Sequence, residues 1–247
     1  MKALKIALLA ATASVAMGGA ALAQDDAGPS LSFNVGAATD YVFRGVSQTD
    51  EEAQVFGGAD LSYGMFYAGV WASNVDFGDD TDAEIDGYIG VKPTVGPVAL
   101  DLAAIYYGYV NEPSDADLAY WEFKAAGSIA AGPATFGAAV FYSPDFTGSA
   151  TDEGWYYELN GSVPIHEKIT LSAAVGHQDV KGADGAGDID YNTWNIGASF
   201  AATEHFGVDV RYHDTDEHDL FTLYDDAGNV VSRLGDERIV IGLKATF

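Results

Sequence analysis

The side chains of this 247-residue sequence that could do chemistry are mainly carboxylates, and they do not form the groupings that a known reaction needs. The chain has 37 Asp and Glu, 5 His and no Cys, which excludes thiol catalysis, disulfide bonds and thiolate metal sites. No histidine lies beside a serine in a hydrolase motif, and no glycine-rich segment carries the lysine and hydroxyl residue of a phosphate-binding loop. We therefore expect no enzyme activity, no catalytic residues and no cofactor.

Two acidic segments resemble metal-binding loops without completing one. The first, Asp184-Gly-Ala-Gly-Asp188-Ile-Asp190, supplies oxygen ligands and glycines, and the second, His213-Asp-Thr-Asp-Glu-His218, supplies imidazoles beside carboxylates. Neither has the full ligand spacing of a calcium loop or a zinc site. We predict that both are solvated acidic loops and that the chain has no dedicated metal site.

The elements that must position the polar side chains are strands. After Pro29 the sequence repeats segments in which apolar and polar residues alternate, separated by turn-rich stretches, as in half-buried β-strands. The predicted strands lie at residues 31–44, 53–63, 65–76, 84–93, 97–110, 118–130, 134–145, 154–165, 168–179, 190–202, 205–213 and 236–247.

Short and long connections alternate along this series. The connections after even-numbered segments are short, whereas those after odd-numbered segments are longer and acidic, the longest being residues 214–235. A barrel threaded up and down through a membrane has tight turns on one side and loops on the other. The pattern predicts an all-β fold: a transmembrane up-and-down antiparallel β-barrel of about 12 strands, with short periplasmic turns and longer acidic extracellular loops.

The alternation gives each strand an apolar face and a polar face. A membrane barrel turns the apolar face to lipid and the polar face to the lumen, whereas a soluble β-sandwich turns its apolar face inward. The polar face here is rich in Gly, Ala, Ser and Asn, and aromatic residues gather toward the long-loop ends of the segments, which favours the barrel. The aromatic residues expected at that membrane interface are Tyr41, Phe43, Trp71, Tyr106, Trp121, Tyr142, Trp155, Tyr157 and Tyr212.

The charged residues of the polar faces, with two tyrosines, are the predicted lining of the lumen. Facing acids and bases could pair across the interior and leave a narrow path, because 12 strands lie between filled barrels of about 8 strands and open porins of about 16–18. The two tyrosines could stack on a sugar or an aromatic solute, or only fill space. The candidates are Asp40, Arg44, Asp60, Glu84, Asp86, Lys92, Asp101, Tyr107, Tyr109, Glu122, Lys124, Glu158, Lys168, Asp209, Arg211, Arg238 and Lys244.

The formal net charge of −26 excludes a nucleic-acid binder held by phosphate contacts. Because the polar faces nearly balance in charge, most of the excess negative charge falls in the long loops. An acidic mouth with low-dielectric walls concentrates cations and repels anions, and added salt weakens the effect. The same charge could instead keep the loops soluble, or bind divalent ions shared with lipopolysaccharide.

The first 23 residues have the layout of a secretory signal peptide. Lys2 and Lys5 precede an apolar stretch from Ile6 to Met17, and Ala21-Leu22-Ala23 forms a small-residue cleavage site before Gln24. The apolar stretch is short for a membrane anchor, which is the alternative. We expect residues 1–23 to be cleaved and residues 24–247 to form one barrel domain in the outer membrane of a Gram-negative bacterium.

The segment from Phe33 to Gly78 resembles the opening of the TorF family of predicted porins, also catalogued as proteobacterial conserved hypothetical outer-membrane proteins. The matching runs are TDYVFRGVSQ (Thr39 to Gln48) and FYAGVWASNVD (Phe66 to Asp76). The chain also ends in Phe247 behind a row of apolar residues, which looks like the terminal strand that the barrel-assembly machinery reads. The resemblance implies an outer-membrane barrel and passive solute transport, and supplies no substrate.

The sequence thus predicts a porin-like channel for passive diffusion of small solutes, favouring cations through its acidic mouth. Its partners would be outer-membrane lipid and lipopolysaccharide, the assembly machinery and the solutes. The alternatives are a structural or adhesive barrel with a plugged lumen and loops that bind a partner or divalent ions, and a secreted soluble sandwich.

Overall fold

The structure is a computed structural model that describes residues 28–113, 117–147, 151–182, 188–224 and 227–247. The predicted signal peptide lies outside these residues, as does most of the segment from Asp184 to Asp190. No helix of the described residues is long and apolar enough to cross a membrane.

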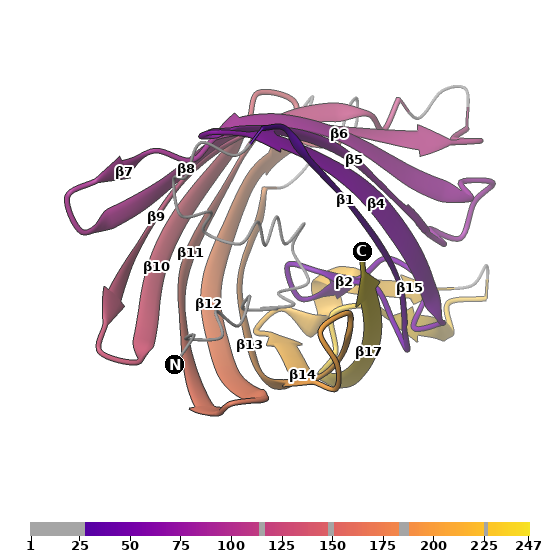
Figure 1. The fold of residues 1–247 in the computed structure, drawn as a ribbon. Coiled ribbons are helices and arrows are strands. Elements are labelled where there is room, and N and C mark those ends of the chain that lie inside the picture. The colour runs from indigo at the N-terminus through magenta and orange to yellow at the C-terminus, as the bar shows by residue number, and fades with distance from the viewer. Residues whose placement is uncertain (1–27, 114–116, 148–150, 183–187, 225–226) are drawn as a thin grey trace.

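The described chain forms one closed antiparallel β-barrel (Figure 1). Its wall strands follow in the order β6-β5-β4-β1-β17-β14-β13-β12-β11-β10-β9-β8, and pairing of β6 with β8 closes the ring, which confirms the predicted 12-stranded barrel. The wall consists of β1 (Ser30–Ala38), β4 (Gln54–Tyr63), β5 (Phe66–Asn74), β6 (Ala83–Val91), β8 (Val98–Val110), β9 (Tyr120–Ala131), β10 (Ala134–Ser143), β11 (Thr151–His166), β12 (Ile169–Gly182), β13 (Ile189–Ala201), β14 (Phe206–Thr215) and β17 (Arg238–Thr246).

The smaller elements lie in the connections. The two-residue β7 (Thr94–Val95) extends the tight turn between β6 and β8, and β2 (Val42–Phe43) pairs with β3 (Val46–Ser47) in the connection from β1 to β4. The connection from β14 to β17 holds the 3₁₀ helix η3 (His218–Phe221) and the paired strands β15 (Thr222–Tyr224) and β16 (Val230–Arg233). We call residues 39–53 the first loop and residues 216–237 the last loop.

The wall alternates as the sequence predicts, with the apolar residues outward. In β17, Ile239 is 66% exposed whereas its neighbour Val240 is 8% exposed, and Leu159 in the middle of β11 is 63% exposed. Such an apolar outer band is what a barrel presents to lipid, because water would be a poor solvent for it. Charged side chains such as Arg211 and Lys124 face inward, where they find hydrogen-bond partners.

One predicted strand is wrong in its second half. The segment 31–44 leaves the wall after Ala38, and Tyr41, Val42 and Arg44 are buried at 5%, 1% and 3% exposure. The strands β2 and β3 form a hairpin whose two turn residues, Arg44 (φ 49) and Gly45 (φ 86), both have left-handed backbones, as in the tight turns that join twisted strands. Gly45 is required there because an added Cβ would lie 2.4 Å from Thr215.

Glycines and tyrosines on β5 and β6 pack as pairs inside the barrel. Tyr67 lies opposite Gly90 and Tyr88 lies opposite Gly69 in the register of these two strands. A Cβ on Gly69 would come within 2.6 Å of the Tyr88 ring, and one on Gly90 within 2.5 Å of the Tyr67 ring. The glycines of the polar face therefore provide room for tyrosine rings that lie across the neighbouring strand.

Candidate functional site

The first loop folds into the barrel and carries Arg44 in the turn of its β2–β3 hairpin, from which the side chain reaches two strands of the far wall. Arg44 Nη2 lies 2.6 Å from Glu122 Oε1 on β9, and Nη1 donates to Gln178 Oε1 on β12 at 2.9 Å. Tyr107 on β8 donates to the other Glu122 oxygen at 3.2 Å. The loop is thus tied across the lumen by a charged pair whose side chains are 2% and 1% exposed.

Aromatic rings surround the Arg44 guanidinium. Its central carbon lies 4.3 Å from the ring centre of Tyr156 and 4.7 Å from that of Phe43, within the range of cation–π attraction. Burial alone would lower the pKa of Arg44, but Glu122 and the nearby tyrosines raise it above its ordinary value. Arg44 therefore stays charged, and its burial depends on Glu122.

A second contact of the first loop joins Tyr41 to β6. The Tyr41 hydroxyl donates to Glu84 Oε1 at 2.7 Å. Burial, and next the negative charge of Glu84, raise the pKa of Tyr41 well above its ordinary value, so this phenol keeps its proton. Tyr41 also packs edge-on against Trp71 at a centroid distance of 5.5 Å.

Asp86 lies two residues beyond Glu84 on the same face of β6 and is fully enclosed, at 0% exposure. Neither of its carboxylate oxygens has a hydrogen-bond partner. Enclosing a carboxyl group without a partner costs free energy. The negative charge of Asp86 contributes to the raised pKa of Tyr41, so the docked first loop lies near a group that would be better solvated if the loop withdrew.

Further along the strands, tyrosines hold carboxylates inside the lumen. Tyr67 donates to Asp101 at 2.6 Å, and Lys124 lies 2.9 Å from the other Asp101 oxygen. Tyr88 donates to Asp60 at 2.6 Å. The Lys92 ammonium lies 4.4 Å from the centre of the Tyr67 ring. These contacts come from β4, β5, β6, β8 and β9, so they brace one side of the interior.

The opposite side of the interior is braced by Arg211 on β14. Its guanidinium contacts Asp209 at 3.2 Å, Asn195 at 2.8 Å and Ser172 at 2.8 Å. Asp209 also accepts from Ser199 at 2.7 Å. The Arg211 side chain is 2% exposed, and its hydrogen bonds hold it in one position. Ordered side chains therefore narrow this part of the lumen.

The remaining candidates lie at different levels of the molecule. Asp40 and Arg238 join the first loop to the start of β17 at 2.8 Å. Glu158 accepts from Asn160 at 2.8 Å. Lys244 is half-buried on β17, whereas Lys168 is exposed in the turn between β11 and β12, and its ammonium donates to the Ala202 carbonyl at 3.2 Å. Tyr109 packs against Phe77 at a centroid distance of 5.6 Å.

Three aromatic residues expected at the membrane interface lie inside instead. Tyr41 and Phe43 belong to the inward first loop, and Trp71 packs against Tyr41 and Phe56 at 5.5 and 6.1 Å. Phe43 packs edge-on against Tyr107 at 6.1 Å. For Tyr41 and Phe43 the cause is that alternation tells which residues share a face, not whether a strand has left the wall. Trp71 is different, because it lies on the wall strand β5 and shares the inward face of Tyr67.

Sequence reasoning missed four residues of this interior: Tyr67, Tyr88, Tyr156 and Gln178. All four fall on polar faces by the same alternation, so their placement was open to prediction. The sequence offered no evident reason to select these four among the other residues of the polar faces. The glycines opposite Tyr67 and Tyr88 are a usable signal, because a glycine facing a tyrosine across two strands leaves space for the ring.

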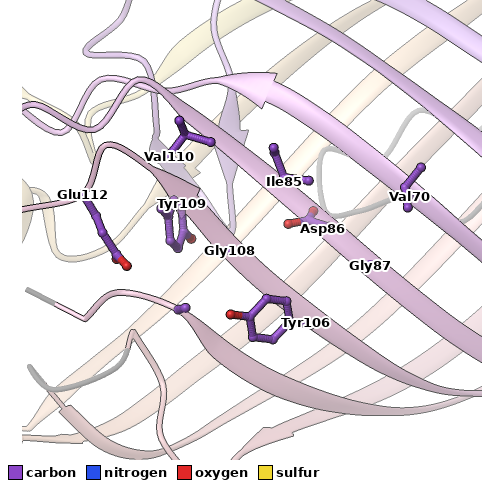
Figure 2. A pocket seen from close by; sticks show the side chains of 10 residues that line it. Val70, Ile85, Asp86, Gly87, Tyr106, Gly108, Tyr109, Val110 and Glu112 are labelled. Carbon is purple, nitrogen blue, oxygen red and sulfur yellow. The ribbon is translucent and has the colours of Figure 1, made fainter.

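A depression of about 350 Å³ lies over β6 and β8 (Figure 2). Four of its lining residues, Val70, Ile85, Tyr106 and Val110, belong to the exposed apolar set. Gly87 and Gly108 leave room between them. The depression therefore belongs to the outer face of the wall rather than to the lumen.

Comparison with known proteins gives one family and several solved structures. The model of a family described as "Bacterial protein of unknown function (Gcw_chp)" matches residues 22–247. No curated protein matches. The TorF name given to the resemblance above stays a prediction.

Two porins are among the solved structures that this chain resembles. The KdgM porin has a TM-score of 0.57 at 7% identity, covering 87% of this chain and 99% of KdgM, and a structure of KdgM in complex with disordered oligogalacturonate gives the same values. The NanC porin has a TM-score of 0.52 at 10% identity, covering 88% of this chain and 99% of NanC. At such identities the likeness establishes the fold, a barrel of the porin type.

Proposed function

The chain belongs to the Gcw_chp family of bacterial proteins of unknown function, and from that premise and its porin-type fold we propose that it is an outer-membrane channel for passive diffusion of small solutes. The observation that carries the proposal is a closed wall with an apolar exposed outer face and a charged, hydrogen-bonded interior. The apolar outer face would contact lipid, and the polar interior would contact water. No step of this function is chemical, so no enzyme activity is proposed.

The same proposal places the protein in the bacterial outer membrane. Residues 1–23 would direct export, and Phe247 would serve the barrel-assembly machinery. In the structure Phe247 pairs with Phe33 across the seam of the barrel, through backbone bonds of 2.9 and 3.0 Å. Outer-membrane lipid and lipopolysaccharide would then surround the apolar band.

The size of the solutes is limited by the interior. The side chains around Arg44, Arg211 and Lys124 occupy the lumen at several levels and hold one another in place. We infer that only small solutes pass, and that the first loop sets the narrowest point. Withdrawal of this loop would widen the path and would expose Asp86 to water.

A cation preference is part of the proposal, and it rests on the acidic loops and the net charge of −26. The oligogalacturonate named with KdgM is an anionic saccharide. The acidic mouth of the present chain gives no reason to propose the same ligand here.

A specific observation favours a second candidate function, a barrel whose lumen stays plugged. Five residues of the first loop, Tyr41, Val42, Arg44, Ser47 and Thr49, are at most 5% exposed. Side chains exposed so little are packed like those of a protein core. In this case the protein would act through its loops, as a structural or adhesive barrel.

Single-channel recording in planar bilayers separates the two candidates. A channel gives discrete conductance steps, and a cation-selective one gives a reversal potential on the cation side that shrinks as salt rises from about 0.1 M to 1 M, because the Debye length falls from about 10 Å to 3 Å. Complete absence of conductance steps would reject the channel and support the plugged barrel. Steps with anion preference at low salt would keep the channel and reject the cation preference.

A further inference from the structure

A group of metal-ligating side chains lies where the last loop leaves and rejoins the wall. Asp214 is the second-last residue of β14, His218 begins η3 and Glu237 directly precedes β17. One ligand atom of each lies within 4.8 Å of the others. We propose that these three residues bind a divalent first-row transition metal ion of the Zn²⁺ or Mn²⁺ kind, which would fasten both ends of the last loop to the rim.

The geometry of the first two ligands suits a bound ion. His218 Nε2 lies 3.0 Å from Asp214 Oδ1. Two neighbouring ligand atoms that are each about 2.1 Å from one ion stand about 3.0 Å apart in an octahedral site and about 3.4 Å apart in a tetrahedral one. Asp214 is also oriented in advance, since its Oδ2 accepts from Tyr212 at 2.8 Å and its Oδ1 accepts from the Thr215 amide at 2.9 Å. The Glu237 side chain, which is exposed, would have to adjust to reach the same ion.

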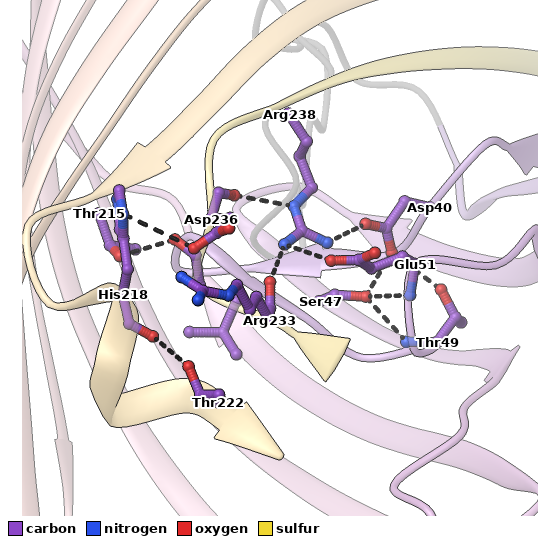
Figure 3. A network of polar contacts seen from close by, with 12 residues as sticks. Asp40, Ser47, Thr49, Glu51, Thr215, His218, Thr222, Arg233, Asp236 and Arg238 are labelled. Atoms are coloured by element: carbon purple, nitrogen blue, oxygen red, sulfur yellow. Dashed lines mark hydrogen bonds and ion pairs between the residues drawn. The ribbon is translucent and has the colours of Figure 1, made fainter. Parts of the chain in front are cut away.

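A separate observation involves Asp236 on the other side of the imidazole (Figure 3). Asp236 Oδ1 is enclosed and receives no hydrogen bond, and it lies 3.6 Å from His218 Nδ1. Histidines that bind a metal through one ring nitrogen usually donate the other N–H to a carboxylate. A small movement of His218 toward Asp236 would complete that arrangement and would supply the missing donor.

The donor set decides the class of ion. One imidazole nitrogen with two carboxylates suits Zn²⁺, and the two carboxylates also suit the harder Mn²⁺, whereas Ca²⁺ and Mg²⁺ prefer sites made only of oxygen. Arg238, which directly follows Glu237, has other partners. Arg238 is engaged with Asp40 at 2.8 Å and Glu51 at 3.4 Å, and with the Arg233 carbonyl at 2.9 Å.

An ion at this place would act on the first loop as well. Ser47 of the first loop donates its amide to the Leu234 carbonyl at 2.8 Å, and Thr215 donates its hydroxyl to the Gly235 carbonyl at 2.9 Å. Fastening the last loop would therefore stiffen the element against which the first loop rests. The site does not depend on the proposed channel function, because the ligands are the same in a plugged barrel.

Titration of the full folded protein in detergent with Zn²⁺, and with Mn²⁺ followed by electron paramagnetic resonance, tests the proposal. We expect saturable binding of one ion per chain, lost in His218→Gln and in Glu237→Gln. Asp236→Asn should weaken binding about 10–100-fold. His205→Gln is the matched control, because His205 also faces a carboxylate, Glu204 at 3.6 Å, on the opposite rim but without a third ligand in reach. It should bind as the parent does.

Three outcomes would overturn the site. These are an absence of saturable binding to the parent protein, equal binding by the parent and both ligand variants, or Ca²⁺ binding as tightly as Zn²⁺. Glu237→Gln guards against a folding artefact, because it changes an exposed side chain, and migration of unheated protein in gels reports whether each barrel has formed.

Discussion

At the scale of single residues, Arg44 decides whether the first loop stays inside the barrel. It is a charge from a loop whose partners, Glu122 and Gln178, come from two strands of the wall. Its own backbone is left-handed at φ 49, which is costly for a residue other than glycine. The ion pair and the surrounding rings must offset that strain.

Replacing Arg44 by Met tests this role. Glu122 would be left enclosed without its partner, which costs about 3–5 kcal/mol for a buried pair, so we expect the first loop to undock. Protease digestion of the folded barrel should then cut the first loop faster. The double variant Arg44→Met with Glu122→Gln should recover part of the loss, and the exposed Arg233→Met should have no effect. Unchanged digestion of Arg44→Met would contradict the assignment.

The pairing of glycine with tyrosine gives a second prediction at the same scale. In Gly69→Ala the new methyl group would meet the Tyr88 ring, which must turn away from Asp60. We expect a loss of about 1–3 kcal/mol in the free energy of unfolding, as for overpacked sites. Urea unfolding in lipid vesicles measures it. Gly87→Ala on β6 is the control, since its Cβ would meet nothing within 4 Å, and equal midpoints for the two variants would refute the pairing.

At the scale of elements, the strand pattern was almost fully predictable. Eleven of the predicted segments agree with wall strands to within a few residues. Local alternation suffices here because each strand meets lipid on one face and the interior on the other. The segment 31–44 failed because its second half keeps the same alternation after leaving the wall. Its Arg44-Gly45 turn was the available sign, as a two-residue hairpin turn with glycine.

The hairpin of β2 and β3 is the element that we expect to limit the pore. Replacing residues 42–47 by a short Gly-Ser linker removes Arg44 and the buried Val42 together. Single-channel conductance should then rise, because the obstruction is gone while the wall remains. As a control, glutamate in place of the exposed Asp79 and Asp80 alters a different loop without changing its charge, and should leave the step size unchanged. If the hairpin variant conducts like its parent, or neither conducts, the first loop is not the constriction.

At the scale of the whole molecule, the outer face is the surface that distinguishes a membrane barrel from a soluble one. Leu159 and Ile165 lie on the same strand, β11, and are 63% and 58% exposed. Leu159 is near the middle of the strand and Ile165 is at its end. An arginine at the bilayer midplane costs about 2–4 kcal/mol, and one near the interface about 0–1 kcal/mol.

We therefore expect Leu159→Arg to destabilise the barrel folded in lipid vesicles, by lowering its free energy of unfolding, much more than Ile165→Arg does. Equilibrium folding into vesicles at a series of urea concentrations measures both. The parent protein provides the reference, and the shared strand controls for local packing. If both variants fold like the parent, the wall does not face lipid and a water-soluble barrel would be the better description.

The sequence by itself determined the wall: the number of strands, their faces, the side of the long loops and the polar character of the interior. These follow from period-two alternation and loop length, which are local properties of the chain. Only the tertiary structure decided what occupies the interior. That Arg44 meets Glu122 and Gln178, residues 78 and 134 positions away, and that Asp214, His218 and Glu237 converge at one point of the rim, depends on how the closed ring brings distant strands and loops together. Asp214 and His218 are neighbours within one acidic segment, but no local pattern brings Glu237 to them or Glu122 and Gln178 to Arg44.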